Sequence, residues 1–288
     1  MITIMDVRWV RVTEVLRYAR PADAVAVEVD GYLNFHHVTA APGRRDARLL
    51  LESGINPVAH VHAPDGARRP VIGIRSSPWK AGHESNPWHD EFDLDHGHVR
   101  YYGDHKPTTI GMPGATPGNR ALLEAWKAHA GTTREERLSA APLVLFRSHT
   151  VESAGKRVPK GHVEFCGVGV IERLEYIVQR DPGTGRSFPN VVLDINVLDL
   201  AESGDRLDWR WIDDRRDARL TAEEALRHAP RSWRQWIEQG RVALPRIRRR
   251  VLSSRVRSAV DQLPLAGSAE AGVLQDVYEF YNGQKHRF

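Results

Sequence analysis

The sequence predicts an α+β fold: a mixed, strongly curved β-sheet with flanking helices, followed by a helical C-terminal segment. Two observations carry this prediction. Between about residues 70 and 200, short apolar or alternating runs recur with one clear helical pattern among them. Beyond about residue 213 the apolar spacing becomes helical. Strands that do not alternate with helices argue against a parallel sheet of βαβ units.

The elements of the sheet region follow from local patterns. Brief apolar stretches before residue 65 predict short strands and one helical piece. A single helix is predicted over residues 120–130, with Asn119 as its N-cap. The stronger strands are expected at residues 71–74, 98–102, 142–146, 163–171, 174–179 and 191–200.

The C-terminal segment predicts four helical pieces. Thr221 and Glu224 have the spacing of a capping box, and Pro230 begins a second helix. An arginine-rich helix over 245–263 and a further one over 273–281 follow. We therefore expect a sheet-rich body over 1–215, in which 1–65 is an N-terminal extension, and a helical linker over 216–288.

Composition narrows the class of protein more than its function. The chain has 288 residues and a net charge of +4, which only mildly favours a polyanionic partner. No apolar run approaches the roughly 20 residues that span a bilayer, so we expect a cytoplasmic protein without membrane contact. Cys166, the single cysteine, lies in an apolar run and is interpreted as a buried structural thiol.

The segment from Trp88 to Lys106 alternates aromatic rings, carboxylates and histidines, and three interpretations compete for it. One is a polar loop with a structural role. Another is a divalent metal site, although the spacing matches no established ligand signature. Its ligands would be His89, Asp90, Asp93, Asp95, His96 and His98.

The third interpretation is a pocket for a nucleotide extruded from a duplex. Such a pocket needs flat aromatic walls and a carboxylate that accepts the cytosine N4 amino group. The walls would be Trp88, Tyr101 and Tyr102, and the acceptor Asp93 or Asp104. Because neighbouring strand residues face opposite ways, only one of the two tyrosines can point into the pocket.

Several of these residues lie in runs that resemble a known family. The runs are GIRSSP at 73–78, Trp88, DLDHGHVRYYGD at 93–104, PGNRAL at 117–122 and VEFCG at 163–167. They resemble SRA (SET and RING-associated) domains, and more closely the SRA-like N-terminal domain of AspBHI/MspJI-type modification-dependent restriction endonucleases. The resemblance extends over about residues 65–215.

The resemblance implies a barrel-like curved sheet that flips a 5-methylcytosine-type base in duplex DNA, as part of a restriction system that defends against foreign DNA. It also implies a C-terminal nuclease domain of the PD-(D/E)xK type. The chain ends where such a domain would begin, so we expect this chain alone not to be catalytic. The expected partner is double-stranded DNA carrying a modified cytosine, without metal or cofactor, and homo-oligomerisation stays open.

Basic and hydroxyl side chains outside the pocket are expected to contact the DNA backbone or a groove. Arg75, Ser76 and Ser77 follow a predicted strand, and Arg147 follows another. Lys156, Arg157 and Lys160 lie on an excursion between two strands. Two other functions stay open: a reader of phosphorothioate-backbone DNA, and a metal-dependent hydrolase that uses the His/Asp loop.

Overall fold

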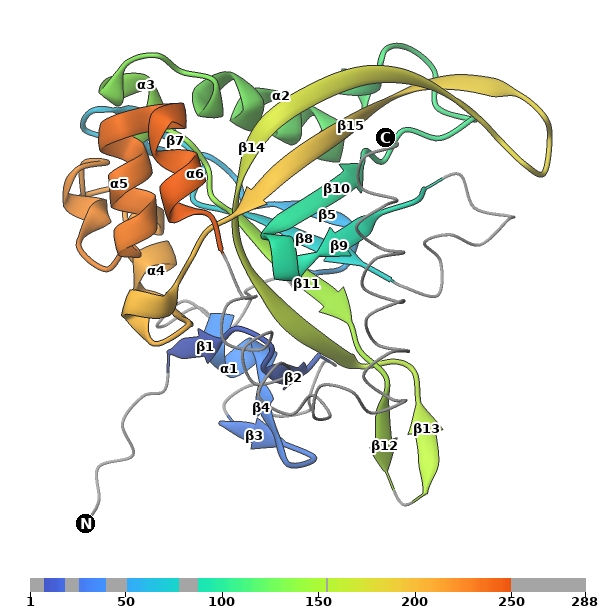
Figure 1. Ribbon diagram of the computed structural model, residues 1–288, viewed down its shortest axis with the longest axis horizontal. Helices are drawn as coiled ribbons and strands as arrows, with labels where there is room; N and C mark the ends of the chain where they lie inside the picture. Colours follow the sequence, from blue (N-terminus) through green and yellow to red (C-terminus); the bar gives the residue numbers. More distant parts are fainter. Residues whose placement is uncertain (1–7, 19–25, 40–50, 78–87, 154, 250–288) are drawn as a thin grey trace, which may run out of the picture. The chain divides into compact units, whose positions relative to one another are not determined.

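A ten-stranded mixed sheet forms the centre of the described chain, which in this computed structural model comprises residues 8–18, 26–39, 51–77, 88–153 and 155–249 (Figure 1). Its main path runs through β3 (Glu28–Val29), β4 (Tyr32–Asn34), β2 (Val15–Arg17), β14 (His162–Arg180), β11 (Leu143–Ser148), β8 (Ile72–Ser76) and β5 (Ile55–Pro57). A branch adds β15 (Ser187–Val197), β10 (His98–Tyr102) and β9 (Glu91–Asp93) beside β14. The pairs β2–β4 and β8–β11 are parallel, and the other pairs are antiparallel.

Three two-stranded ribbons and several short helices complete the described part. The ribbons are β1 (Trp9–Arg11) with β16 (Arg206–Asp208), β6 (Val61–Ala63) with β7 (Gly66–Arg68), and β12 (Val151–Ser153) with β13 (Lys156–Val158). The α-helices are α1 (Phe35–Thr39), α2 (Pro117–His129), α3 (Arg134–Leu138), α4 (Arg210–Arg216), α5 (Arg231–Gln239) and α6 (Leu244–Ile247). The 3₁₀ turns are η1 (Leu94–His96), η2 (Pro113–Ala115), η3 (Ala201–Ser203), η4 (Glu224–Leu226) and η5 (Gly240–Ala243).

The sheet is strongly curved, as the long ribbon β14–β15 shows (Figure 1). The pairing of β14 shifts register twice, once against β11 and once against β15, and such bulges bend and twist a strand. Gly167 at the first shift has a φ of +131°, and a Cβ there would approach Val197 Cγ1 to 2.7 Å. The predicted α+β class is thus confirmed. The barrel-like closure is not, because no closed barrel forms among the described strands.

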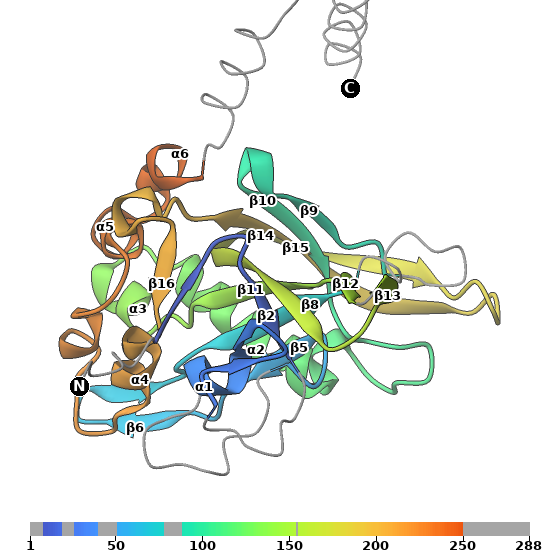
Figure 2. The ribbon, with the colours of Figure 1, turned by 90° about the horizontal axis from the view of Figure 1, so that it is seen from below.

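Hydrophobic side chains cover both faces of the sheet. Along β11, Val144 and Phe146 join one cluster, whereas Leu143 and Leu145 join the other. The first cluster includes the tryptophans of α4 and α5, and the second includes the apolar face of α2. Helices α3 to α6 gather at one end of the sheet, and the tip of β14–β15 extends at the other (Figure 2). Cys166 is buried, as predicted, and burial raises its pKa far above the usual value of a thiol.

The described part of the expected linker packs within the same core as the sheet. Trp233 and Trp236 of α5 are fully buried, and the reciprocal bonds of the predicted capping box join Thr221 and Glu224. Helix α6 ends at Ile247, so the long arginine-rich helix expected from residue 245 does not continue through 248 and 249. The rest of that helix and the one expected over 273–281 lie outside the described residues. None of the described helices is long and apolar enough to cross a membrane.

Helix α2 begins earlier than predicted. It starts at Pro117 with Thr116 as N-cap, so the interpretation of Asn119 as the cap is wrong. Proline suits the first helical position because its missing N–H has no partner there in any helix. The Asn119 side chain instead accepts a hydrogen bond from the backbone N–H of Asp104, 2.8 Å away. This contact ties α2 to the loop that follows β10.

Candidate nucleic-acid interface

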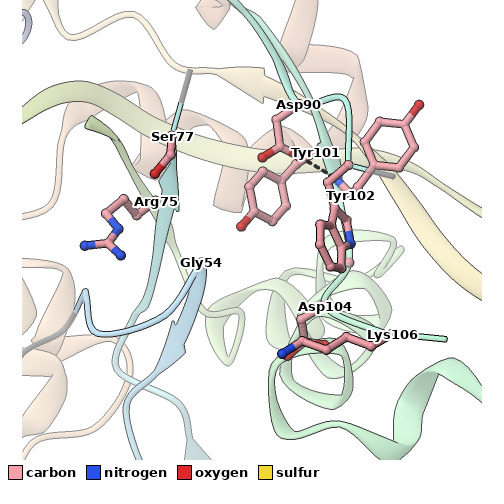
Figure 3. Close-up of a pocket in the computed structure, with 10 residues that line it drawn as sticks. Gly54, Arg75, Ser77, Asp90, Tyr101, Tyr102, Asp104 and Lys106 are labelled. Carbon is pink, nitrogen blue, oxygen red and sulfur yellow. Dashed lines mark hydrogen bonds between the residues drawn. The ribbon is translucent and has the colours of Figure 1, made fainter. Parts of the chain in front are cut away.

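An open cavity of about 320 Å³ lies between the end of β8 and the end of β10 (Figure 3). Cavities that bind small molecules range from roughly 300 to 1,000 Å³, so this one lies at the small end. Four residues from the predicted base pocket line it, with two of the predicted backbone contacts and four residues that sequence reasoning did not assign to it. The lining is Gly54, Arg75, Ser77, Trp88, Asp90, Tyr101, Tyr102, Gly103, Asp104 and Lys106.

The two neighbouring tyrosines point in opposite directions from β10. The Tyr101 ring points into the cavity and Tyr102 points away from it (Figure 3). The Tyr102 ring lies near that of His89, with 6.4 Å between the centroids. The Tyr101 hydroxyl sits beside Gly54, where an added Cβ would approach the oxygen to 2.7 Å. Burial raises the pKa of Tyr101 well above its usual value, so the phenol stays neutral.

Asp90 is the carboxylate that lies next to Tyr101. Its Oδ1 accepts the backbone N–H of Tyr102 at 3.0 Å, and its Oδ2 accepts the Ser76 hydroxyl at 2.9 Å. Burial raises the pKa of Asp90 to about 6, and the two hydrogen bonds oppose this shift. Sequence reasoning considered Asp90 only as a metal ligand, because these contacts form only when the fold brings Asp90 close to both β8 and β10.

Asp104 also borders the cavity, but part of its carboxylate is already occupied. Its Oδ1 accepts the Thr116 hydroxyl and the backbone N–H of Asn119. The fully buried Asn119 in turn donates to Asn190 Oδ1 at 3.3 Å, and Asn190 donates to the Gly103 carbonyl at 2.9 Å. This network holds the turn after β10, which places Asp104 on the cavity wall.

Asp93, the other predicted acceptor, lies outside the cavity lining. Its carboxylate accepts the backbone N–H of His96 at 3.2 Å and lies 2.7 Å from Nδ1 of the same ring. His98, another of the predicted metal ligands, has its Nε2 3.4 Å from Asp194 Oδ1. Within the described ranges, no group of three or more histidine, cysteine, aspartate or glutamate side chains is arranged to hold a metal ion.

The predicted backbone contacts near the sheet are largely engaged within the protein. Ser76 donates to Asp90, and the Ser77 hydroxyl lies 3.1 Å from that of Ser148. Arg147 donates to Glu164 at 2.8 Å, which balances its charge. The Arg75 guanidinium lies over the Tyr18 ring, 5.5 Å from its centroid. Of these four, Arg75 and Ser77 line the cavity.

The three other predicted contacts lie on an exposed ribbon. Lys156 and Arg157 belong to β13, and Lys160 follows it; all three are exposed. The β12–β13 ribbon extends away from the sheet, as Figure 1 shows. None of these three residues is among those that line the cavity.

A protein-family model matches residues 69–247 of this chain, which is more than half of its length, and the family is described as restriction endonuclease AspBHI N-terminal. The chain belongs to this family. The family expected from the sequence, that of DNA-recognition domains of modification-dependent restriction endonucleases, is thereby confirmed. No curated protein sequence matches the chain.

Solved structures agree with membership of the AspBHI N-terminal family. The structure of MspJI restriction endonuclease in complex with a 27-mer oligonucleotide is 62% identical in sequence, with a TM-score of 0.80. That match covers 97% of this chain but 62% of the MspJI chain, so this chain spans less than two thirds of its relative.

Two more distant structures share the fold at 18% sequence identity. The DNA recognition domain of the cytosine modification-dependent restriction endonuclease LpnPI has a TM-score of 0.52, over 81% of this chain and 89% of that one. The modification-dependent restriction endonuclease AspBHI has a TM-score of 0.54, over 83% of this chain and 93% of that one.

Proposed function

We propose that this domain binds double-stranded DNA and holds a modified cytosine, extruded from the duplex, in the cavity beside Tyr101. The observation that carries the proposal is the Tyr101 ring, which points into an open cavity next to the Asp90 carboxylate. The oligonucleotide bound to the 62% identical MspJI supports DNA as the partner. In the whole protein, we expect this recognition to direct a separate nuclease of the PD-(D/E)xK type.

The cavity offers the two kinds of contact that an extruded cytosine needs. Tyr101 and Trp88 can provide aromatic surface for the base. Each Asp90 oxygen accepts one hydrogen bond within the protein and keeps a further lone pair, so the carboxylate can also accept the N4 amino group. We favour Asp90 as the acceptor because it bonds to the residue after Tyr101, whereas Asp104 lies on the turn after β10 and Asp93 lies outside the lining.

The balance of energies sets how selective such a pocket can be. Stacking on aromatic side chains contributes roughly 1–3 kcal/mol per base, which offsets an unstacking cost of a few kcal/mol. Burial of one methyl group adds about 0.8 kcal/mol, or about fourfold in affinity. Modified cytosine should thus be preferred over plain cytosine only a few-fold. A different base, whose hydrogen-bonding groups do not match those of the pocket, should bind more weakly by roughly 1–3 kcal/mol.

Affinity for the rest of the duplex would come from basic side chains. Lys156, Arg157 and Lys160 on the exposed ribbon can meet phosphates, and none of them forms an ion pair with another residue in the described part of the chain. Contacts to phosphates contribute affinity that depends on salt but not on sequence or modification. In this proposal the cavity selects the base, and the ribbon contributes affinity for the duplex.

Titration of the protein with three matched duplexes tests the proposal. The duplexes carry one 5-methylcytosine, plain cytosine, or plain cytosine with a phosphorothioate at the same step. We expect the methylated duplex to bind about fourfold more tightly than the other two. Preference for the phosphorothioate duplex would favour a backbone reader, and equal affinities would contradict recognition of the base.

A further inference from the structure

The loop between β10 and α2 presents two apolar side chains to solvent beside the cavity. Ile110 is 92% exposed and Met112 is 69% exposed, and they are two of the five large apolar side chains exposed among the described residues. Gly111 between them has a φ of +97°, a conformation that favours glycine and places both neighbours at the loop tip. A single exposed apolar residue is ordinary, but two at one tip beside a binding cavity call for an explanation.

The loop is built to hold this tip in place. Three of its first residues, Gly103, Asp104 and Lys106, form part of the cavity wall. Its two ends are tied together, because the Thr116 hydroxyl donates to Asp104. Within the loop, the Thr109 N–H donates to the Lys106 carbonyl at 2.9 Å, and the Ala115 N–H donates to the Met112 carbonyl at 2.8 Å. The tip is therefore a structured projection whose first residues form part of the cavity wall.

Extrusion of a base from a duplex leaves a gap between the neighbouring base pairs. Proteins that unstack DNA often insert isoleucine, methionine or similar apolar side chains between bases. We propose that Ile110 and Met112 enter the duplex as a wedge at the step from which the cytosine is extruded. This inference rests on the proposed function, and it assigns to these two residues the stabilisation of the opened duplex.

The surroundings of the tip favour DNA as its partner over a protein or a lipid surface. Two exposed basic residues, Lys106 and Arg120, belong to the stem and its base, where phosphates on either side of an opened step would lie. Arg120 donates to the carbonyls of Gly114 and Ala115, each at 3.3 Å, which fixes it against the loop. The continuity of the loop with the cavity wall would place tip and pocket on the same stretch of duplex.

The test compares two duplexes that differ in the cost of extrusion. In one, 5-methylcytosine is paired with guanine; in the other, it lies opposite an abasic site, so that it is already unpaired. For the variant Ile110→Ala/Met112→Ala, we expect an affinity loss of about tenfold on the paired duplex and of less than about threefold on the abasic one. Val242→Ala, at an apolar position 75% exposed elsewhere, serves as the control and should change neither.

The conservative variant Ile110→Leu/Met112→Leu keeps apolar bulk and should retain wild-type affinity on both duplexes. Equal losses on the two duplexes, or no loss on the paired one, would overturn the wedge. These outcomes are distinct from failure of the proposed function, because in that case the wild-type protein itself would not prefer methylated over plain DNA. An unchanged melting temperature of each variant checks that the fold is retained.

Discussion

Asp90 Oδ1 accepts the backbone N–H of Tyr102 at 3.0 Å, and this bond fixes the end of β10 beside the cavity. Because Asp90 Oδ2 also accepts the Ser76 hydroxyl from β8, one carboxylate links two strands that are not paired with each other. Tyr101, directly before Tyr102, is thereby held with its ring in the cavity. Asp90 thus positions the cavity wall, and under the proposed function it would also present its carboxylate to the base.

Substitution Asp90→Asn should lower affinity for the methylated duplex about tenfold, because a charge-assisted hydrogen bond to the base becomes a weaker neutral one. The amide has an acceptor oxygen for the Tyr102 N–H and an NH₂ group with two donor hydrogens, so the Ser76 hydroxyl can rotate to accept and the local fold can persist. Fluorescence anisotropy with labelled duplex measures the change. Asp93→Asn is the matched control, and a larger loss at Asp93 than at Asp90 would show that the acceptor has been misassigned.

Substitution Gly54→Ala should displace the Tyr101 hydroxyl, because the new Cβ would lie 2.7 Å from it. We expect a several-fold loss of affinity for the methylated duplex. In the double variant Gly54→Ala/Tyr101→Phe the clashing oxygen is absent, so affinity should partly recover. Gly183→Ala, whose Cβ would meet nothing closer than 4.0 Å, is the control. A loss that Tyr101→Phe does not relieve would mean that Gly54 acts by another route.

Replacement of Lys156, Arg157 and Lys160 by alanine should weaken binding to methylated and plain duplexes equally. Each lost phosphate contact reduces the slope of log affinity against log salt by about 0.9, so the slope should become shallower by about 2 to 3. A control with the same charge change replaces Arg219, Arg227 and Arg231, which are exposed on the helical segment. A changed preference for methylated DNA in the ribbon variant would instead indicate base readout by the ribbon.

His129 should make stability depend on pH. Burial lowers its pKa to about 4, and the hydrogen bond to the Ala141 carbonyl opposes this shift. The ring is enclosed, with its centroid 5.3 Å from that of Trp236, and its Nδ1 accepts the Ile171 N–H. The unfolded chain binds the proton at its ordinary pKa near 6.5, so this stability is complete above that pH and is lost as pH falls towards 4. A folded-state pKa of about 4 corresponds to a loss on the order of 2 kcal/mol by pH 4.5.

Urea unfolding of wild type and His129→Gln isolates this contribution. Asp90 and Asp213, whose pKa values are raised to about 6, change stability in the opposite direction over the same range, and both variants share that effect. The advantage of wild type over His129→Gln should therefore shrink between pH 7.5 and 4.5. An advantage that stays constant would contradict a neutral, buried histidine.

Local sequence patterns predicted the parts of the site that depend on one strand. The alternation at residues 98–102 matches β10 over its whole length, and this strand carries both tyrosines. The bounds of β8 and β11 were likewise predicted to within two residues at each end. Continuous apolar runs bounded by polar residues indicate buried strands.

Residues that join the site through tertiary contacts could not be found in this way. Asp90 and Asp93 lie three apart in the same acidic stretch, and only their tertiary contacts distinguish them: Asp90 reaches Ser76 and Tyr102, whereas Asp93 bonds locally to His96. Gly54 comes from a distant loop whose approach to Tyr101 depends on the pairing of β5 with β8. Asn119 has the spacing of a helix cap, yet its side chain bonds to Asp104 because the loop after β10 packs there.

The affinity ratio between methylated and plain duplex, measured for Tyr101→Ala and Tyr102→Ala side by side, tests the central claim most directly. Since Tyr101 points into the cavity and Tyr102 points away, Tyr101→Ala should reduce the ratio to about one while salt-sensitive binding persists. Tyr102→Ala should keep most of the wild-type ratio. Equal, mild effects at both positions, or a ratio that survives Tyr101→Ala, would contradict a base held against the Tyr101 ring.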